Sequence, residues 1–349
     1  MARICGKMSA LLNRKDLKLT TLAIIGGGIA GRSLLFHLAK SGIPFQKITL
    51  FSSEKFAKSC SLNSTAIVAR RGVSTGLSSL GDTLAASVDL FEKHVKEDGP
   101  EGVTRIPQYT GASSKIDQFK KRYPDGENSQ RMGPLETSIE FYHASEEAYM
   151  IDPGTYLNWL MEKARSLPLE VVDDFVKSVT PGDEVCVETL GGIKQNFDRL
   201  IFAGGVYNQH WKEILTPEKE SLSKTVPGSY LEFSDLSLDI PSLSLTLDGD
   251  NFIYDSLKKR LLIGSTTETV THELSSRGEL KKIYERLATH LTLALPEYEK
   301  ARVCTGLREK ASKREPYLIQ RENIFAIGGY YKNGYSVNLK LSQDLLKKL

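Results

Sequence analysis

The segment Thr21–Lys40, TLAIIGGGIAGRSLLFHLAK, contains the pattern that decides the fold. Its apolar run Leu22–Ile25 is typical of a strand buried on both faces. A glycine-rich turn interrupts the run, and leucines then recur at helical spacing, so the segment predicts a strand, a tight turn and a helix. In this pattern Gly26 allows the turn, Gly28 lets a pyrophosphate approach the backbone, and Gly31 lets the helix pack closely on the strand. The phosphates would be bound by the free amides and the positive dipole end of the helix.

The residues after this helix decide how the ribose of a dinucleotide would be bound. PFQKITLF, residues 44–51, predicts the second strand of a βαβ unit. An acidic residue commonly follows that strand, whereas this chain has Ser52, Ser53 and Glu54 there. Either Glu54 reaches the ribose hydroxyls from two residues later, or Ser52 hydrogen-bonds to them and Glu54 is a solvated loop charge.

Length and composition indicate a globular protein of two domains. The chain has 349 residues and a net charge of +3, which by itself requires neither nucleic acid nor an anionic membrane. No apolar run approaches the length of a membrane span. The six histidines are dispersed, so we expect no metal site. The cysteines are also scattered, as expected of reduced thiols in a cytoplasmic protein: Cys5, Cys60, Cys186 and Cys304.

The predicted elements do not divide into two contiguous halves. Asp152 and Pro153 predict the N-cap and first residue of a helix that continues to Arg165. A buried strand, residues 199–202, runs into the small residues 203–205, which would allow close approach of a ligand. Strand-rich segments separate these elements, so the dinucleotide-binding unit is interleaved with a second unit. Such an arrangement can enclose a long cofactor and disfavours a nicotinamide dehydrogenase with one contiguous dinucleotide-binding block.

Several strings, in this order, resemble the motifs of the glycine oxidase and D-amino-acid oxidase family of FAD-dependent enzymes. This family includes sarcosine-type oxidases and the FAD domain of an enzyme that modifies a wobble uridine in tRNA. The strings are IIGGGIAGRSLLFHLAKSG, SLNSTAIVA, MIDPGTYLNWLMEKAR, DRLIFAGGVYN, TVPGSYLEF, NFIYDSLKKRLLIGSTTE, TGLREKASKREPYL and IFAIGGYYKNGYSVNL.

The resemblance implies an α/β fold in which a Rossmann-like, glutathione-reductase-type FAD-binding domain is interleaved with an α+β substrate domain built on an antiparallel sheet. Residues 1–20 would be an N-terminal extension. The FAD-binding domain would comprise residues 21–82, 150–210 and 300–349, and the substrate domain residues 83–149 and 211–299.

The resemblance also implies contacts to FAD along the whole chain. Val176 would meet the adenine through its backbone, and the loop around Gly329 would bring backbone donors and a helix N-terminus to the flavin ring. The expected FAD-binding residues are Gly26, Gly28, Ile29, Ala30, Gly31, Ser52, Ser53, Asn63, Ser64, Thr65, Ala66, Val176, Ala203, Gly204, Gly329, Lys332, Asn333, Gly334 and Tyr335.

Arg308, Tyr331 and Lys332 are the expected catalytic residues. Arg308 occupies the position of the family's arginine that pairs with a substrate carboxylate, because a planar guanidinium in a dry pocket binds and orients that group. From its own sequence context Arg308 could also be a surface ion-pair residue. Lys332 stands where many relatives have a second arginine, and it keeps the charge but not the fork-shaped donor. Tyr330 and Tyr331 either line the site or are core aromatics.

The segment 300–321 is markedly basic, with Lys300, Arg302, Lys310, Lys313, Arg314 and Arg321. Two interpretations follow: a solvated face, or a rim that meets an anionic partner such as tRNA. Glu309 and Glu315, which flank these cations, are expected to be solvated.

The resemblance therefore implies FAD-dependent oxidation of a small amine or amino acid, of the glycine, sarcosine or D-amino-acid type, by hydride transfer to the flavin to give an imine. Two other functions stay open. A tRNA wobble-uridine carboxymethylaminomethyl oxidase would bind RNA in a salt-dependent manner. A noncatalytic flavoprotein or assembly factor would keep FAD as a structural element, and Lys332 in place of arginine keeps that alternative open.

Overall fold

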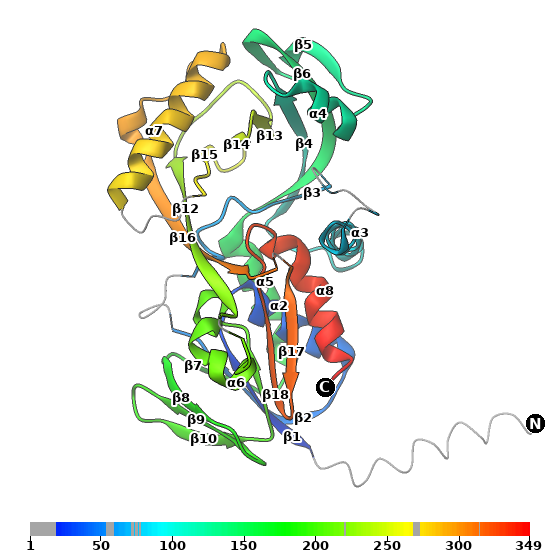
Figure 1. Cartoon of the computed structure of the whole chain (residues 1–349), viewed down its shortest axis with the longest axis vertical. Coiled ribbons are helices and arrows are strands. Elements are labelled where there is room, and N and C mark those ends of the chain that lie inside the picture. Colours follow the sequence, from blue (N-terminus) through cyan, green and yellow to red (C-terminus); the bar gives the residue numbers. More distant parts are fainter. Residues whose placement is uncertain are drawn as a thin grey trace, which may run out of the picture.

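The structure is a computed structural model. Of residues 273–276 it describes the backbone alone. The described residues are 19–53, 59–70, 73, 76, 78–219, 221–267, 273–313 and 315–349. Within these ranges the chain builds a lower and an upper sheet, one above the other along the long axis of the molecule (Figure 1).

The lower sheet forms around β1 (Thr20–Ile25), in which Leu22, Ala23 and Ile24 are fully buried. Among the described residues it has six strands in the order β17-β18-β11-β1-β2-β7, parallel except for β17. Successive side chains of a strand point to opposite faces, so Leu22 and Ile24 pack on one face and Ala23 on the other. The other strands are β2 (Phe45–Phe51), β7 (Leu169–Val172), β11 (Arg199–Phe202), β17 (Tyr317–Arg321) and β18 (Ile324–Gly328).

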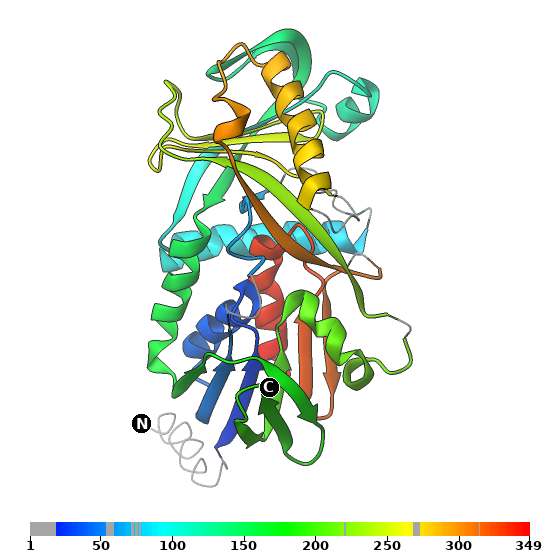
Figure 2. The same ribbon diagram turned by 90° about the vertical axis from the view of Figure 1, so that its left-hand side faces the viewer.

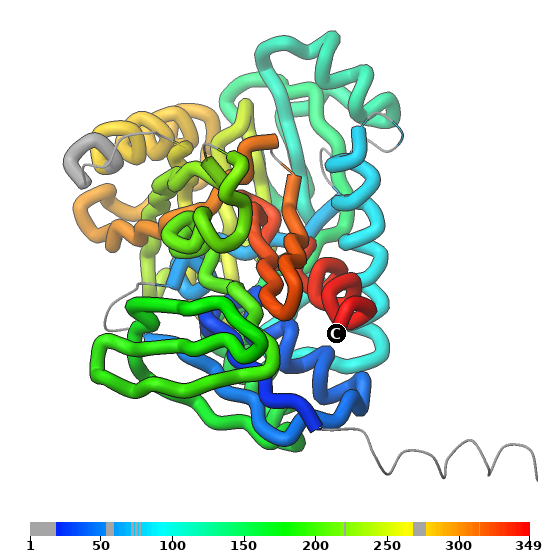
Figure 3. Tube along the Cα trace, turned by 60° about the horizontal axis from the view of Figure 1, so that its bottom comes forward, coloured from blue at the N-terminus to red at the C-terminus, as the bar shows by residue number. Residues whose placement is uncertain are grey.

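The two faces of the lower sheet have different covers (Figures 1 and 3). On one face lie α2 (Ile29–Ser41) and α8 (Gly334–Leu346), which share a core cluster with Leu22, and α5 (Pro153–Lys163) packs beside α2. The other face packs against a small antiparallel sheet, a 3-10 helix and α6. These elements are β8 (Val176–Thr180), β9 (Val185–Thr189), β10 (Lys194–Phe197), η3 (Gly205–Trp211) and α6 (Lys212–Leu215). Cover on both faces explains why β1 is an uninterrupted apolar run.

The upper sheet follows the order β16-β12-β15-β14-β13-β4-β6-β3, with β5 paired to β6, across the described residues. It is antiparallel except where β13 lies parallel to β4. On one face α7 (Glu273–His290) packs Leu280 and Leu287 into a cluster with Leu245 and Ile263. The strands are β3 (Ile67–Ala69), β4 (Val103–Ala112), β5 (Glu127–Met132), β6 (Leu135–Ile151), β12 (Ser223–Phe233), β13 (Leu243–Leu247), β14 (Asp250–Asp255), β15 (Arg260–Gly264) and β16 (Arg302–Ala311).

Two features connect the sheets. Strands β12 and β16 pair over their length and run as a ribbon from the upper sheet down to the lower one (Figure 2). Helix α3 (Ser79–Asp98) crosses between the sheets and packs against α8, and its N-cap Ser78 accepts a hydrogen bond from the amide of Gly81 at 3.0 Å. The remaining elements are α4 (Ile116–Arg122), η2 (Ala164–Ser166) and η4 (Tyr298–Lys300).

The chain passes repeatedly between the sheets, which confirms the predicted fold class of a Rossmann-like unit interleaved with a unit built on a largely antiparallel sheet. The predicted helix start at Asp152 is also confirmed, because Asp152 Oδ2 accepts the amide of Thr155 at 3.1 Å. Strands β3 and β16 hydrogen-bond into the upper sheet although they lie in the ranges 21–82 and 300–349. The division into domains by residue range therefore stays a prediction.

Candidate active site

The glycine-rich turn after β1 is shaped by contacts that exclude side chains. Gly26 has a φ of +117°, and a Cβ there would lie 2.5 Å from the carbonyl oxygen of Ala203. A Cβ on Gly31, in the first turn of α2, would overlap the carbonyl oxygen of Gly26. Gly28 is the N-cap residue of α2. The turn can therefore keep its shape only with glycine at 26 and 31.

A cavity of about 780 Å³ is lined by residues of both sheets. Its lower half lies at the carboxyl ends of the parallel strands β1, β2, β11 and β18, where ligands of such sheets bind. Gly31 and Gly329 are not among the lining residues found in the described ranges. The predicted FAD-binding residues that line the cavity are Gly26, Gly28, Ile29, Ala30, Ser52, Ser53, Asn63, Ser64, Thr65, Ala66, Val176, Ala203, Gly204, Lys332, Asn333, Gly334 and Tyr335.

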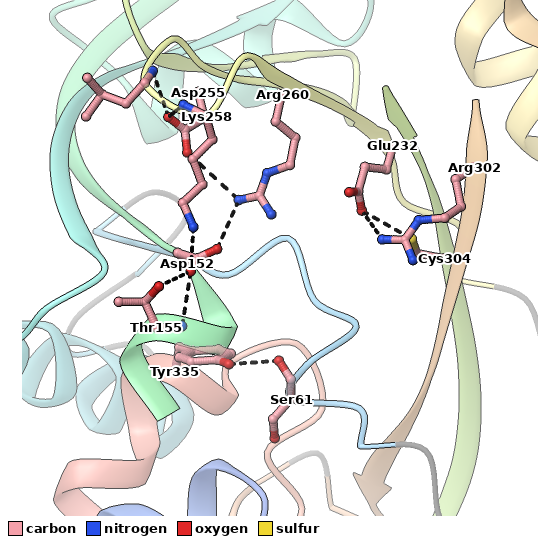
Figure 4. A network of polar contacts seen from close by, with 11 residues as sticks. Ser61, Asp152, Thr155, Glu232, Asp255, Lys258, Arg260, Arg302, Cys304 and Tyr335 are labelled. Carbon is pink, nitrogen blue, oxygen red and sulfur yellow. Dashed lines mark hydrogen bonds and ion pairs between the residues drawn. The ribbon is translucent and has the colours of Figure 1, made fainter. Parts of the chain in front are cut away.

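The loop before β3 connects the two helices whose N-termini face this cavity. Ser61 Oγ accepts the amide of Ile29, the first residue of α2, at 3.0 Å. Tyr335, in the first turn of α8, donates its hydroxyl to the carbonyl oxygen of Ser61 at 2.7 Å (Figure 4). Both helix dipoles therefore direct their positive ends at the same part of the cavity, which suits an anionic group.

The end of β2 offers hydroxyl groups in place of the usual acidic residue. Ser52 and Ser53 line the cavity, and Ser53 Oγ is buried without a hydrogen-bond partner among the described residues. Val176, 4 % exposed, lines the same region. The alternative ribose ligand, Glu54, lies outside the described residues.

The loop between β18 and α8 is fixed by Glu309. The amide of Gly329 donates to Glu309 Oε2 at 2.7 Å, and the amide of Tyr331 donates to the Glu309 carbonyl oxygen at 2.9 Å. The Gly329 amide is therefore engaged within the protein. Tyr331 adopts a positive φ of 50° and lines the cavity with Lys332, whose ammonium lies 5.8 Å from the Tyr331 ring centroid.

Arg308, on β16, reaches across β12 into the cavity. A Cβ on Gly228 would overlap its guanidinium, so the glycine makes room for it. Nη1 donates to the carbonyl oxygen of Thr266 at 3.0 Å and Nη2 to Ser265 Oγ at 3.1 Å. Burial lowers the pKa of Arg308, although the group stays charged at neutral pH. In the described structure both hydrogen bonds go to uncharged oxygens, so no carboxylate there balances this charge.

The expectation that Glu309 is solvated is wrong. Its side chain is 5 % exposed and lines the cavity. Oε1 accepts hydrogen bonds from the hydroxyls of Tyr317 at 2.6 Å and Ser223 at 2.9 Å. Burial raises the pKa of this carboxyl, while its three donors, including the Gly329 amide, favour the ionised form. Because neighbouring residues of a strand point to opposite sides, Arg308 and Glu309 serve different parts of the site.

Much of the positive charge of segment 300–321 is paired. Arg302 contacts Glu232 at 2.8 Å, Arg321 contacts Glu218 at 2.6 Å, and Lys300 contacts Glu297 at 3.2 Å. These pairs favour the interpretation of a solvated, charge-balanced face. Arg314 lies outside the described residues.

Asp152 joins the upper sheet to the helix beneath it (Figure 4). Besides capping α5, its carboxylate contacts Lys258, in the turn between β14 and β15, at 2.7 Å and Arg260, the first residue of β15, at 3.6 Å. Burial raises the pKa of Asp152, but the hydrogen bonds from Lys258 and Thr155 outweigh it and hold the pKa below its usual value. The carboxylate is thus charged at neutral pH and holds the hairpin of β14 and β15 to the start of α5.

The residues of the lower half fit FAD. The turn at Gly26–Gly28 leaves backbone exposed to the cavity where a pyrophosphate would bind, and two helix N-termini face it. The unpartnered Ser53 Oγ is a suitable hydrogen-bonding group for a ribose hydroxyl. The cavity volume is in the range of sites for large organic ligands.

The fold and this cavity define a dinucleotide-binding protein of the Rossmann class. The sequence profile of the FAD dependent oxidoreductase family, DAO, matches residues 21–337. The chain belongs to this family, and its cofactor is FAD. No curated protein matches it by sequence.

Solved structures of the same fold cover nearly the whole chain. Glycine oxidase from Geobacillus kaustophilus is 18 % identical with a TM-score of 0.72, over 94 % of this chain and 95 % of that one. Iminodiacetate oxidase from Chelativorans sp. BNC1 is 17 % identical with a TM-score of 0.74, over 92 % and 93 %. L-α-glycerophosphate oxidase from Mycoplasma pneumoniae, solved with FAD bound, is 14 % identical with a TM-score of 0.76, over 95 % and 94 %.

Sequence reasoning missed the polar residues in the upper half of the cavity. Gln108, Ser244, Asn251 and Arg122 line it, yet they lie on four separate elements. Neither β4 (VTRIPQYTGA) nor β14 (DNFIYD) alternates regularly between polar and apolar residues, so the sequence pattern gave no signal for this polar surface. None of the helices in the described ranges is long and apolar enough to cross a membrane.

Proposed function

We propose that this chain oxidises a small amine or amino acid, of the glycine, sarcosine or D-amino-acid type, at the carbon next to the nitrogen. The guanidinium of Arg308 carries this proposal. It is a cation held inside the cavity by uncharged oxygens, so its charge is available to a substrate carboxylate. A glycine oxidase and an iminodiacetate oxidase among the similar structures support the amine class.

The protein's contribution is to bind and orient the substrate. Bound FAD would supply the acceptor for a hydride from the substrate carbon, which would leave an imine that water hydrolyses. Arg308 would hold the carboxylate in a fixed plane, which sets the position of the neighbouring C–H bond. Glu309 is engaged by three donors, so we do not assign it as a base, and we expect the amine to bind in its neutral form.

The test is the visible spectrum of the FAD-loaded protein under anaerobic conditions. Glycine, sarcosine and a panel of D-amino acids are added, and then glycerol 3-phosphate and bulk tRNA. We expect one of the amines to bleach the flavin band. Bleaching by glycerol 3-phosphate alone would reassign the substrate to an alcohol, and bleaching by tRNA alone would favour the RNA-modifying oxidase. A band that nothing bleaches would favour the noncatalytic flavoprotein.

The matched variants are Arg308→Lys and Arg302→Lys. Lysine keeps the charge of Arg308 but not its two parallel donors, so kcat/KM for the amine should fall by about 100-fold. Arg302 is exposed and paired with Glu232, and its replacement should change kcat/KM by less than about twofold. Equal kinetics for the two variants would remove Arg308 from the substrate site.

A further inference from the structure

We propose that the substrate carries a second acid group, which binds at a polar patch formed by Gln108, Ser244, Asn251 and Arg122. This distal patch lies in the upper half of the cavity. The inference rests on the proposed function and narrows its substrate to amines with two carboxylates. It is carried by the register of the upper sheet, by burial and by charge.

The register of the sheet brings three members of the patch together. Gln108 on β4 is directly opposite Ser244 on β13, and Asn251 on β14 is opposite Thr246, two residues further along β13. Directly opposite side chains in a sheet lie about 5 Å apart. The patch is therefore one continuous surface on the face of the sheet that α7 leaves uncovered.

These residues are polar although the sheet buries them. Gln108 is 3 % exposed and Ser244 is 2 % exposed. Gln108 Oε1 has no hydrogen-bond partner among the described residues. An amide oxygen is an acceptor and cannot bond to an ionised acid group. The acid would therefore be bound by the donors of the patch, which are the amide N–H₂ groups of Gln108 and Asn251 and the hydroxyl of Ser244.

Arg122, an exposed residue that lines the cavity, provides the charge. It is the last residue of α4, and the loop before this helix is held to the turn between β13 and β14. The amides of Ser113 and Ser114 donate to Asp248 Oδ1 at 3.1 and 3.3 Å. Asp248 precedes Gly249, which also lines the cavity, so α4 and the patch are positioned by the same turn.

The patch is within reach of a molecule held by Arg308. The guanidinium donates to Ser265 Oγ, and Ser265 follows Gly264, the register partner of Asn251. The backbones of Asn251 and Gly264 are therefore one strand spacing apart. This places the guanidinium of Arg308 within roughly 10 Å of Asn251. A carboxylate at Arg308 and a second acid group near Arg122 would be joined by a chain of a few carbons.

The experiment measures binding to the FAD-loaded protein through the change in its visible spectrum. The probes are straight-chain dicarboxylic acids of four to eight carbons, each compared with the monocarboxylic acid of the same length. At one length we expect the dicarboxylate to bind at least about tenfold more tightly than its partner. Arg122→Gln should reduce this preference to within about twofold. Lys121→Gln, on the same helix but outside the cavity lining, should keep it.

The outcomes separate the two proposals. No preference at any length, no binding of any acid, or a preference that survives Arg122→Gln would overturn the distal patch as an acid site, even if glycine or sarcosine is oxidised. A preference that depends on Arg122, in a protein that oxidises no amine, would support the patch and overturn the proposed reaction.

Discussion

The two halves of the cavity are built from different parts of the polypeptide. The lower half is shaped by backbone: the turn at Gly26, the ends of parallel strands and two helix N-termini. The upper half consists of side chains on separate strands, such as Arg308, Gln108 and Asn251. Backbone geometry tolerates almost no substitution, whereas side chains on a sheet can be exchanged one at a time. We therefore propose that the lower half specifies the cofactor and the upper half the substrate.

The largest effect is expected from a methyl group in the lower half. Gly31→Ala would place a Cβ against the carbonyl oxygen of Gly26, so we expect the free energy of unfolding to fall by about 3 kcal/mol or more, with loss of FAD binding. Gly154, in the first turn of α5, has no atom within 4 Å of its would-be Cβ. Gly154→Ala should leave stability unchanged or raise it by up to about 1 kcal/mol. Denaturant unfolding and FAD content measure both, and normal FAD content in Gly31→Ala would contradict a backbone-defined site.

This contrast explains how much the sequence could predict. The turn, β1 and α2 follow from local signals, because glycine spacing and apolar periodicity act within one segment. Burial of Glu309 and the patch around Gln108 arise from pairings between distant strands, such as Thr225 on β12 with Glu309 on β16 and Ser244 on β13 with Gln108 on β4. Single-sequence patterns do not report such pairings. Arg308 was predicted only through a family resemblance, since its own neighbours are charged.

Acid should weaken the lower half through α2. Burial, the largest cause, together with His94 and Lys40 lowers the pKa of His37 to about 4, against the opposing effect of Asp98. The unfolded chain, with an ordinary pKa near 6.5, binds the proton more readily, so stability is full above pH 6.5 and is lost as the pH falls to 4. The expected loss is roughly 3 kcal/mol.

Unfolding by denaturant at a series of pH values tests this expectation. His37→Gln should flatten the profile between pH 6.5 and 4, whereas the exposed His210→Gln should leave it as in the wild type. A profile unchanged by His37→Gln would show that other groups control the acid response.

Glu309 lies where the halves meet, so its removal should affect both stability and FAD. Glu309→Gln replaces one carboxylate oxygen by an N–H₂ group, so that a donor would face the donor N–H of Gly329. We expect the free energy of unfolding to fall by about 2 kcal/mol. The FAD dissociation constant should rise by about tenfold as the β18–α8 loop loosens. Glu315→Gln, on an exposed residue, should change stability by less than about 0.5 kcal/mol. Equal stability and affinity in the two variants would contradict the assigned role.

The smallest effect on stability is expected in the upper half, where a buried polar group has no hydrogen-bond partner among the described residues. Gln108 Oε1 has no partner among the described residues, so Gln108→Met should leave stability unchanged or raise it by up to about 1 kcal/mol. Gln209 Oε1 accepts the amides of Leu222 and Ser223, both at 3.0 Å, so Gln209→Met should lower stability by about 2 kcal/mol. Thermal unfolding measures the pair, and equal losses would show that Gln108 has a structural role.

Asp152 restricts how the cavity can open. Its carboxylate completes the N-terminus of α5 and neutralises Lys258 on the upper sheet, so a hinge between the sheets would separate a partly buried ion pair and expose a helix end. Such an opening is energetically unfavourable in every catalytic cycle. We expect substrate and product to exchange without a hinge motion, with the two sheets behaving as one rigid body.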